Sequence, residues 1–397
     1  MFPHWIEEAS LAKVKTLGLY IHVPFCRRAC HYCDFYFTPR ASLMEDYVEA
    51  LLREIEAYRD ILGAFPIQTV FLGGGTPSWL PQQLLGRIFQ RLATFSTFSP
   101  TEVTLEANPE DIYPDNLRFW HGLGVTRISV GIQSFSAQVL FSLGRFHDPN
   151  TARQAVEYLS ESEIPSWNAD LIFAVPGQTV ESFLEDIDFL IKKRVPHLSL
   201  YGLTIEEHTV FYKKLQLGRI NLVDEEIYAT AYLRAHEFLA NAGLIWYEIS
   251  NWAQPNHECR HNWRYWRREP YIGLGPSAHS YIPEVRWANS RSLRTYISDW
   301  ANNTYSIEMV ERLSPQDVLT ELWITKFRTR IGIAWSDLQG LSDRVIRKLK
   351  VAVAQAKDKG WLYETDTGFR LSPRGALFSD ELASRFSVIT ETALAYH

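Results

Sequence analysis

The feature that most constrains the fold is a regular alternation of short apolar runs with amphipathic segments along the first half of the chain. Six runs have the length and composition of buried strands. Strands that alternate with helices predict βαβ units and a parallel sheet covered on both faces. Six such units favour an α/β fold, a partial TIM-like (β/α)6 barrel, over a flat doubly wound sheet. The predicted strands are 17–23, 69–72, 102–106, 127–132, 169–175 and 197–201.

The segments between these runs carry apolar residues at helical spacing. In the first of them, Leu43, Tyr47, Leu51 and Ile55 fall near one helix face, as in a helix that packs on a sheet. We therefore expect a covering helix after each strand. The predicted helices are 43–62, 81–95, 114–123, 137–143, 151–160 and 180–192.

The rest of the chain divides into an extension of the barrel and a smaller module. A long helix is predicted over 225–241, and an irregular, aromatic-rich stretch follows over 251–281. A boundary is predicted near residue 290. The first domain, 1–290, is then the barrel with its aromatic-rich extension, and the second, 291–397, is a C-terminal helical module.

The C-terminal module is predicted to be winged-helix-like. A winged helix invites a DNA-binding interpretation, and Arg344, Arg347, Lys348 and Lys350 form a basic run. A solvated helix face is the more common origin of such a run. We therefore expect the module to dock on the barrel or to cover it. Its predicted elements are helices at 315–328, 343–359 and 379–386 and a two-stranded wing at 361–371.

Net charge and cysteine usage exclude several classes of protein. The formal net charge of -6 opposes binding to a phosphate backbone, so no nucleic-acid partner is expected. Three of the four cysteines lie within eight residues, which is not a disulfide framework and predicts a reducing, cytoplasmic location. No secretory, transit or membrane-spanning segment is predicted, because the first apolar stretch is short and ends at Pro24.

Cys26, Cys30 and Cys33 follow the first predicted strand with the spacing Cys-x3-Cys-x2-Cys. Cysteine thiolates are the usual ligands of iron–sulfur clusters. Three local cysteines leave one iron of a four-iron cluster without a protein ligand, and an open position distinguishes reactive from structural metal sites. The alternative is a structural zinc site, completed by Cys259 or by a histidine.

Glycines and polar residues mark the ends of the next predicted strands. Ligands of barrel enzymes bind at the carboxyl ends of the strands, so these residues indicate an active site. The run Gly73-Gly74-Gly75 lets backbone groups approach a ligand closely, but it lacks the Lys-Ser/Thr of a phosphate-binding loop. The simpler alternative for the glycines is a tight turn between a strand and a helix.

Four side chains near these strand ends suit a polar ligand with an amino acid end. Glu106 and Asp170 could accept hydrogen bonds from ribose hydroxyls or an amine, Arg145 could hold a carboxylate bidentately, and Gln133 suits either role. The alternatives are helix capping for the two acids and a surface salt bridge for the arginine.

Residues 18–281 resemble the radical S-adenosylmethionine (SAM) enzymes, in particular the oxygen-independent coproporphyrinogen III oxidase group. The Cys-x3-Cys-x2-Cys spacing is the signature of that superfamily. The resemblance extends to Tyr-Ile-His-Val-Pro-Phe-Cys at 20–26, Gly-Gly-Gly-Thr-Pro at 73–77, Gly-Ile-Gln-Ser-Phe at 131–135, Leu-Gly-Arg-Phe-His at 143–147 and Asp-Leu-Ile-Phe-Ala-Val-Pro-Gly at 170–177.

The resemblance implies a radical SAM barrel with a 4Fe-4S cluster on Cys26, Cys30 and Cys33, and SAM bound at the remaining iron. One or two SAM molecules are expected. The resemblance assigns no catalytic residue. The implied SAM contacts are Tyr20, Tyr32, Gly74, Gly75, Thr76, Glu106, Gln133, Arg145 and Asp170.

Two departures and one motif select a subgroup. The decarboxylating oxidases usually carry another cysteine where this chain has Phe35, and a longer segment than the 25 residues found here before the first cysteine. Residues 261–266, His-Asn-Trp-Arg-Tyr-Trp, match the His-Asn-x-x-Tyr-Trp signature of the HemW-type heme chaperones. The resemblance then implies heme binding and delivery of heme to hemoproteins, which we expect to be membrane-associated respiratory proteins. The alternative is radical oxidative decarboxylation of a tetrapyrrole propionate.

Two residues are candidate heme ligands. His261 is one, because imidazole is a common axial ligand of heme iron, and Cys259 is the other, because a thiolate can also serve. Each has a simpler alternative. The histidine could be packed among aromatic residues with hydrogen bonds to its ring, and the cysteine could be a lone reduced thiol.

Overall fold

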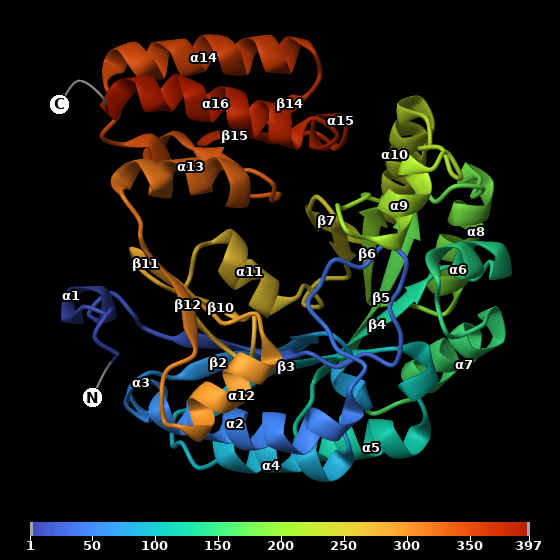
Figure 1. The fold of residues 1–397 in the computed structure, drawn as a ribbon. Helices are drawn as coiled ribbons and strands as arrows, with labels where there is room; N and C mark the ends of the chain where they lie inside the picture. The colour runs from blue at the N-terminus through green and yellow to red at the C-terminus, as the bar shows by residue number, and fades with distance from the viewer. Residues whose placement is uncertain (1–2, 395–397) are drawn as a thin grey trace.

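The computed structural model describes residues 3–394, and its main feature is a curved sheet of twelve strands (Figure 1). The order of the strands is β12-β11-β10-β9-β1-β2-β3-β4-β5-β6-β8-β7. All six predicted strands are confirmed and lie side by side in chain order. They are β1 (Leu17–Val23), β2 (Ile67–Gly74), β3 (Phe98–Ala107), β4 (Arg127–Gln133), β5 (Ser166–Phe173) and β6 (His197–Gly202).

Strands β1 to β6 are parallel, and antiparallel strands extend the sheet at both edges. Strand β9 (Tyr271–Leu274) pairs in parallel with β1, next to β10 (His279–Ile282), β11 (Val285–Asn289) and β12 (Ile307–Arg312). At the other edge lie β8 (Asn251–Ala253) and β7 (Ile245–Glu248). Within residues 3–394 the end strands β12 and β7 do not pair. The predicted partial barrel is therefore confirmed.

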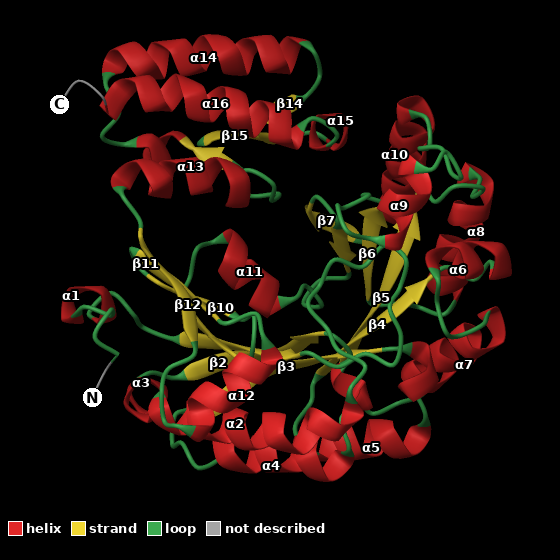
Figure 2. Ribbon diagram, viewed as in Figure 1, coloured by secondary structure: helices red, strands yellow, loops and turns green. Residues whose placement is uncertain are grey.

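Helices cover the convex side of the sheet, as Figure 2 shows. Helix α2 buries Tyr47, Val48, Leu51 and Ile55 completely, which is the apolar face that its spacing predicts. The covering helices are α2 (Met44–Ala57), α3 (Arg59–Ala64), α4 (Gln82–Leu92), α5 (Pro114–Gly122), α6 (Ala137–Leu143), α7 (Pro149–Ser160) and α8 (Val180–Lys192). The short helix α1 (Glu8–Leu11) precedes β1, and the short helices η1 (Ala41–Leu43), η2 (Pro77–Trp79) and η3 (Pro109–Asp111) lie in the connections that follow β1, β2 and β3.

The stretch 251–281, predicted to be irregular, is ordered into short elements, so that prediction was wrong. It contains β8, helix α11 (Arg260–Trp266), β9 and the start of β10. Each is three to seven residues long. A segment this short contains too few residues for a periodic pattern to indicate a helix or a strand. The long helix α10 (Glu225–Asn241) is confirmed, and a short helix, α9 (Val210–Gln216), precedes it.

Residues 293–312 contact the large sheet. Helix α12 (Leu293–Ala301) packs on α2, and β12 pairs with β11. The predicted boundary near residue 290 therefore precedes a helix that packs on α2 and a strand of the large sheet. The C-terminal part has the predicted helices and, in addition to the two strands of the wing, a third strand. Its elements are α13 (Pro315–Thr325), α14 (Asp343–Asp358), α15 (Pro373–Ala376), α16 (Ser379–Leu394), η4 (Trp335–Leu338), β13 (Ile333–Ala334), β14 (Leu362–Glu364) and β15 (Gly368–Leu371).

Ion pairs join the C-terminal helices to the large sheet. Arg328 Nε lies 3.1 Å from Glu248, and Arg268 Nε lies 2.7 Å from Glu321 on α13. In Figure 1, α11 lies between the sheet and α13. None of the helices in residues 3–394 combines the length and the apolar character needed to cross a membrane.

A buried carboxyl group fastens α2 to the antiparallel edge of the sheet. Glu54 accepts hydrogen bonds from the Gly275 N–H (2.7 Å), Asn289 Nδ2 (2.6 Å) and the Tyr296 hydroxyl (2.5 Å). Its side chain has no exposed surface, and this burial raises its pKa from 4.5 to about 7, against the opposing effect of its three donors. Glu54 is therefore protonated in the folded chain at a pH where it is ionised in the unfolded chain.

Glu54 makes the free energy of unfolding depend on pH. Between pH 4.5 and 7 the folded state retains a proton that the unfolded state has lost, so the stabilisation from Glu54 is fully present below pH 4.5 and is lost as the pH rises to about 7. The fall amounts to about 3 kcal/mol. Urea unfolding at a series of pH values measures it. We expect Glu54→Gln to remove this contribution, and Asp46→Asn, on the exposed side of α2, to retain it. An unchanged pH slope in Glu54→Gln would contradict the assignment.

Candidate active site

A cavity of about 630 Å³ lies at the carboxyl ends of the parallel strands. The three clustered cysteines lie in its wall, on the loop that follows β1. Residues from the ends of β2 to β6 face the cysteines. The strand ends therefore meet at one site, as predicted. Such a volume is typical of a small-molecule site.

The cysteine loop is held by backbone hydrogen bonds to itself and to a neighbouring helix. Cys26 N donates to Thr38 O (3.2 Å), and Thr38 N donates to Pro24 O (2.7 Å). His31 N donates to Leu143 O at the end of α6 (2.9 Å). Burial raises the pKa of Cys26 to about 12 and that of Cys33 to about 11. Iron binding at these thiols would therefore release protons.

The thiol arrangement fits a cluster better than a zinc ion. In residues 3–394 no three His, Cys, Asp or Glu side chains converge on one metal position. A zinc ion needs such convergence, whereas a 4Fe-4S cluster takes one thiolate at each iron. Cys259 is buried beside Glu102, does not line the cavity and cannot complete the set.

Eight of the nine predicted SAM contacts line the cavity. Tyr20 does not. Its side chain faces a smaller chamber of about 220 Å³ that shares Glu106 and Asp170 with the main cavity, and its hydroxyl lies 3.0 Å from His22 Nδ1. The residues that do line the cavity are Tyr32, Gly74, Gly75, Thr76, Glu106, Gln133, Arg145 and Asp170.

The glycines at 73–75 pack against other segments of the protein and not only against the cavity. Gly74 has φ +102°, and a Cβ there would lie 2.4 Å from the His22 ring. A Cβ on Gly75 would lie 2.7 Å from the carbonyl oxygens of Val23 and Phe25. Gly75 N and Thr76 N donate to those same oxygens at 2.8 and 2.7 Å. The glycines are therefore needed to join the end of β2 to the cysteine loop.

Two carboxyl groups face the cavity from β3 and β5, the strands on either side of β4. Glu106 accepts a hydrogen bond from Gly74 N (3.1 Å), and burial raises its pKa to about 8, with a further contribution from the charge of Asp170. Asp170 is held by Asn168 Nδ2 (2.7 Å) and the Ser129 hydroxyl (3.3 Å), and burial raises its pKa too. Neither side chain caps a helix.

Gln133 is the strained residue of the site. It ends β4 with φ +65°, where the register between β4 and β5 shifts. Its side-chain oxygen is buried without a hydrogen-bond partner in the described part of the chain. A strained backbone and an unsatisfied buried acceptor are features of ligand-binding positions.

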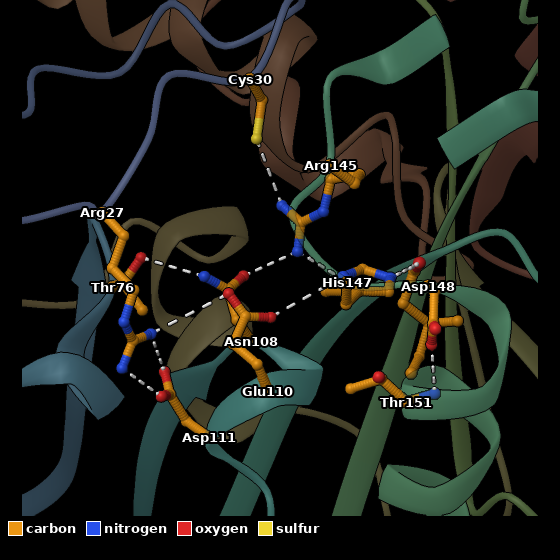
Figure 3. A network of polar contacts seen from close by, with 12 residues as sticks. Arg27, Cys30, Thr76, Asn108, Glu110, Asp111, Arg145, His147, Asp148 and Thr151 are labelled. Atoms are coloured by element: carbon orange, nitrogen blue, oxygen red, sulfur yellow. Dashed lines mark hydrogen bonds and ion pairs between the residues drawn. The ribbon is translucent and has the colours of Figure 1, made fainter. Parts of the chain in front are cut away.

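Arg145 is not free to hold a carboxylate through both of its terminal nitrogens. Nη2 donates to Asn108 Oδ1 (2.7 Å) and Gly131 O (2.8 Å), and Nη1 donates to Cys30 Sγ (3.4 Å) and the Tyr32 hydroxyl (3.5 Å) (Figure 3). Only Nε, which is buried, lacks a partner among the described residues. The surface salt bridge is excluded as well. The guanidinium instead contacts a cysteine sulfur directly.

No individual role was predicted for the polar residues behind Arg145. Asn108 contacts both Arg145 and Thr76, and its place at the end of β3 was the one available signal. His147 Nδ1 lies 3.8 Å from Glu110 Oε2. Burial and the charge of Arg145 lower the pKa of His147 to about 3, so this histidine is neutral and the contact is not an ion pair.

The two candidate heme ligands are inaccessible. His261 is fully buried, and both ring nitrogens have partners, Thr69 Oγ1 at 2.8 Å and the Tyr265 hydroxyl at 2.9 Å. Cys259 is 1% exposed, and burial raises the pKa of its thiol to about 12. The geometry thus counts against both assignments and favours the packed histidine and the lone reduced thiol. Helix α11 closes the bottom of the barrel, where Asn262 and Tyr265 line the smaller chamber.

Comparison with known proteins gives the family. The model of the Radical SAM superfamily matches residues 20–190. The heme chaperone HemW of Synechocystis is 35% identical over 354 residues, 86% of this chain and 85% of that protein. The heme chaperone HemW of Escherichia coli is 33% identical over 390 residues, 95% of this chain and 99% of that protein. This chain belongs to the HemW family.

A solved structure shares the fold over nearly the whole chain. Coproporphyrinogen III oxidase (HemN) from Escherichia coli, a radical SAM enzyme, superposes with a TM-score of 0.81 and covers 96% of this chain and 92% of its own. At 22% identity this likeness shows the fold alone. Membership of the radical SAM superfamily implies a 4Fe-4S cluster and SAM, which the cysteines and the lining of the cavity fit.

Cluster assembly should depend on the three cavity cysteines and not on the fourth. We expect Cys26→Ala, Cys30→Ala and Cys33→Ala each to lose most of their iron and sulfide after anaerobic reconstitution, because each removes one thiolate ligand. Cys259→Ala is the matched control and should retain the wild-type content. Iron and sulfide assays measure both. Full content in Cys33→Ala, or loss in Cys259→Ala, would contradict the assignment.

Proposed function

We propose that this protein is a heme chaperone, which binds heme and passes it to hemoproteins, and that a 4Fe-4S cluster and SAM occupy the cavity beneath the heme. The observation that carries the proposal is Phe35. It stands where the decarboxylating relatives carry a cysteine, lines the cluster cavity and is 70% exposed. An apolar ring held in solvent beside a cofactor cavity indicates contact with an apolar partner.

The mouth of the cavity has the two chemical features of a heme site. Phe35, Phe37 and Phe146 provide apolar rings, and Phe146 is 65% exposed. Arg28 also lines this mouth, is exposed and has no hydrogen-bond or ion-pair partner among the described residues. Heme is a flat apolar ring with two carboxylates, which suits aromatic contacts on its faces and a guanidinium at its edge.

The deeper cavity has the features of a polar cofactor site. Glu106 and Asp170 offer acceptors for ribose hydroxyls or an amine, and Gln133 offers an unpaired amide oxygen. Thr76 contacts the sulfur of Cys26, and Arg145 contacts the sulfur of Cys30. When bound, the cluster supplies one-electron chemistry toward SAM. These side chains would hold and orient the cofactors.

The proposed acceptors are hemoproteins, including membrane-associated respiratory proteins, and the proposed site of action is the cytoplasm. The names of the relatives support a role in heme delivery. The exposed phenyl rings at the mouth support transfer by direct contact, since an acceptor can reach heme there without unfolding the barrel.

Heme affinity should depend on the mouth of the cavity. We expect Phe35→Ser and Arg28→Glu each to weaken heme binding about tenfold, through lost apolar contact and through repulsion of a propionate respectively. Titration followed in the Soret band measures this. Phe141→Ser is the matched control, because Phe141 is 85% exposed on α6 but does not line the cavity. Wild-type affinity in Phe35→Ser would reject this location, and no heme uptake by the wild-type protein would reject the chaperone function.

The decarboxylase alternative predicts a different result. An oxygen-independent coproporphyrinogen III oxidase would convert coproporphyrinogen III under reducing conditions with SAM, and the shared fold keeps this alternative open. Because Phe35 carries no thiol, we expect no turnover by the reconstituted wild-type protein. Anaerobic incubation followed by chromatography of the porphyrins measures it. Product formation that disappears in Cys26→Ala would favour the oxidase.

A further inference from the structure

A continuous series of hydrogen bonds links two of the cavity cysteines through Asn108, and Figure 3 shows its part from Thr76 to Cys30. Cys26 Sγ lies 3.2 Å from the Thr76 hydroxyl, and Asn108 Nδ2 donates to that hydroxyl at 3.2 Å. On the other side, Arg145 Nη2 donates to Asn108 Oδ1 at 2.7 Å, and Arg145 Nη1 donates to Cys30 Sγ at 3.4 Å. The Asn108 side chain is thus the central member of the series and contacts both Thr76 and Arg145.

The donor and acceptor of each hydrogen bond in this series follow from Arg145 at one end and from the cluster-bound Cys26 at the other. A guanidinium can only donate, so the Asn108 group beside it must be the carbonyl oxygen. The amide N–H₂ of Asn108 therefore faces Thr76 and makes the Thr76 hydroxyl an acceptor. A cysteine that ligates the cluster is a thiolate and can only accept, so in the cluster-bound form the one hydrogen of this hydroxyl points at Cys26 Sγ. Both cysteine sulfurs consequently receive a hydrogen-bond donor.

We propose that Asn108 is a positioning residue that directs two hydrogen bonds onto the sulfurs of the cluster and so raises its reduction potential. Reduction adds negative charge to the cluster and its thiolates, so donors to sulfur stabilise the reduced form more than the oxidised form. Groups around metal ligands commonly tune a site in this way. The proposal rests on a cluster bound by Cys26, Cys30 and Cys33 and does not depend on heme binding.

The backbone around Asn108 is fixed independently of the cluster. Asp111 N donates to Asn108 O at 3.0 Å, and the Ser78 hydroxyl donates to Asp111 Oδ2 at 2.7 Å. Arg27 binds both oxygens of Asp111, at 3.0 and 2.6 Å. Because these contacts hold the end of β3 in place, substitution of the amide changes the hydrogen bonds of its side chain without releasing the loop.

Asn108→Asp tests the direction of the chain. The carboxylate still accepts from Arg145, but it also accepts from the Thr76 hydroxyl and turns that hydrogen away from Cys26. We expect the reduced fraction of the cluster at a fixed potential to fall about tenfold, a midpoint lower by about 59 mV for one electron. Anaerobic redox titration followed by electron paramagnetic resonance measures the midpoint without SAM, and iron content is measured on the same samples.

Thr76→Val separates the direction of the hydrogen bond from the added charge. In the wild-type background it removes the donor to Cys26, so the midpoint should fall. In the Asn108→Asp background that donor is already lost, so it should cause no further fall. Equal falls in both backgrounds would overturn the proposal, because aspartate would then act through its charge alone.

Asn108→Ala keeps the proposal testable if the aspartate variant loses iron. It breaks both links without adding a charge, and the midpoint should again fall while the iron content stays at the wild-type level. An unchanged midpoint at full iron content would overturn the proposal. Heme titration of the same variants tests the chaperone function separately, since a normal midpoint shift without heme binding would reject only that function.

Discussion

The site depends on the backbone contact between the end of β2 and the cysteine loop. Gly75 N and Thr76 N donate to the carbonyl oxygens of Val23 and Phe25, and no side chain fits between the two segments. This contact holds the cysteine loop against the end of β2 and places the Thr76 hydroxyl 3.2 Å from Cys26 Sγ. Because Gly75 has no Cβ, the cysteine loop can approach the end of β2 closely, and this approach sets the position of the cysteines. A glycine run that looks like a ligand cradle in the sequence is, in the fold, the joint that holds the cluster ligands.

The parts of the fold that could be predicted are those whose pattern is longer than one element. The six parallel strands and their helices repeat a strand, a turn and an amphipathic segment, so local propensity and topology agree. The stretch 251–281 follows no repeat, and its elements of three to seven residues take their form from packing on the barrel. The position of the site was equally predictable, because the carboxyl ends of parallel strands meet at one end of a barrel. The partners within it were not. Arg145 and Cys30 are 115 residues apart in the chain, and the contact between them depends on the register of the whole sheet.

The motif that contains His261 has a structural role in the fold. The spacing of its signature places His261 and Tyr265 one helical turn apart on α11, so that the imidazole and the phenol hydrogen-bond to each other. The other ring nitrogen bonds Thr69 on β2, 192 residues away in the chain. Burial lowers the pKa of this histidine to about 3, which keeps it neutral and compatible with an apolar barrel floor. The motif thus fastens α11 beneath the strands. Nothing in its residue types distinguishes that role from iron ligation, because an imidazole offers the same two nitrogens in either case.

The cavity changes in chemical character from its floor to its mouth. Its floor contains the two carboxyl groups, Glu106 and Asp170, and its middle contains the cysteines with their donors, Thr76 and Arg145. Its mouth contains exposed phenyl rings. A polar cofactor and an apolar macrocycle would therefore use different contacts and need not compete for the same side chains. Thr76 and Arg145, which hydrogen-bond to the cysteine sulfurs, line the same cavity as both groups of residues.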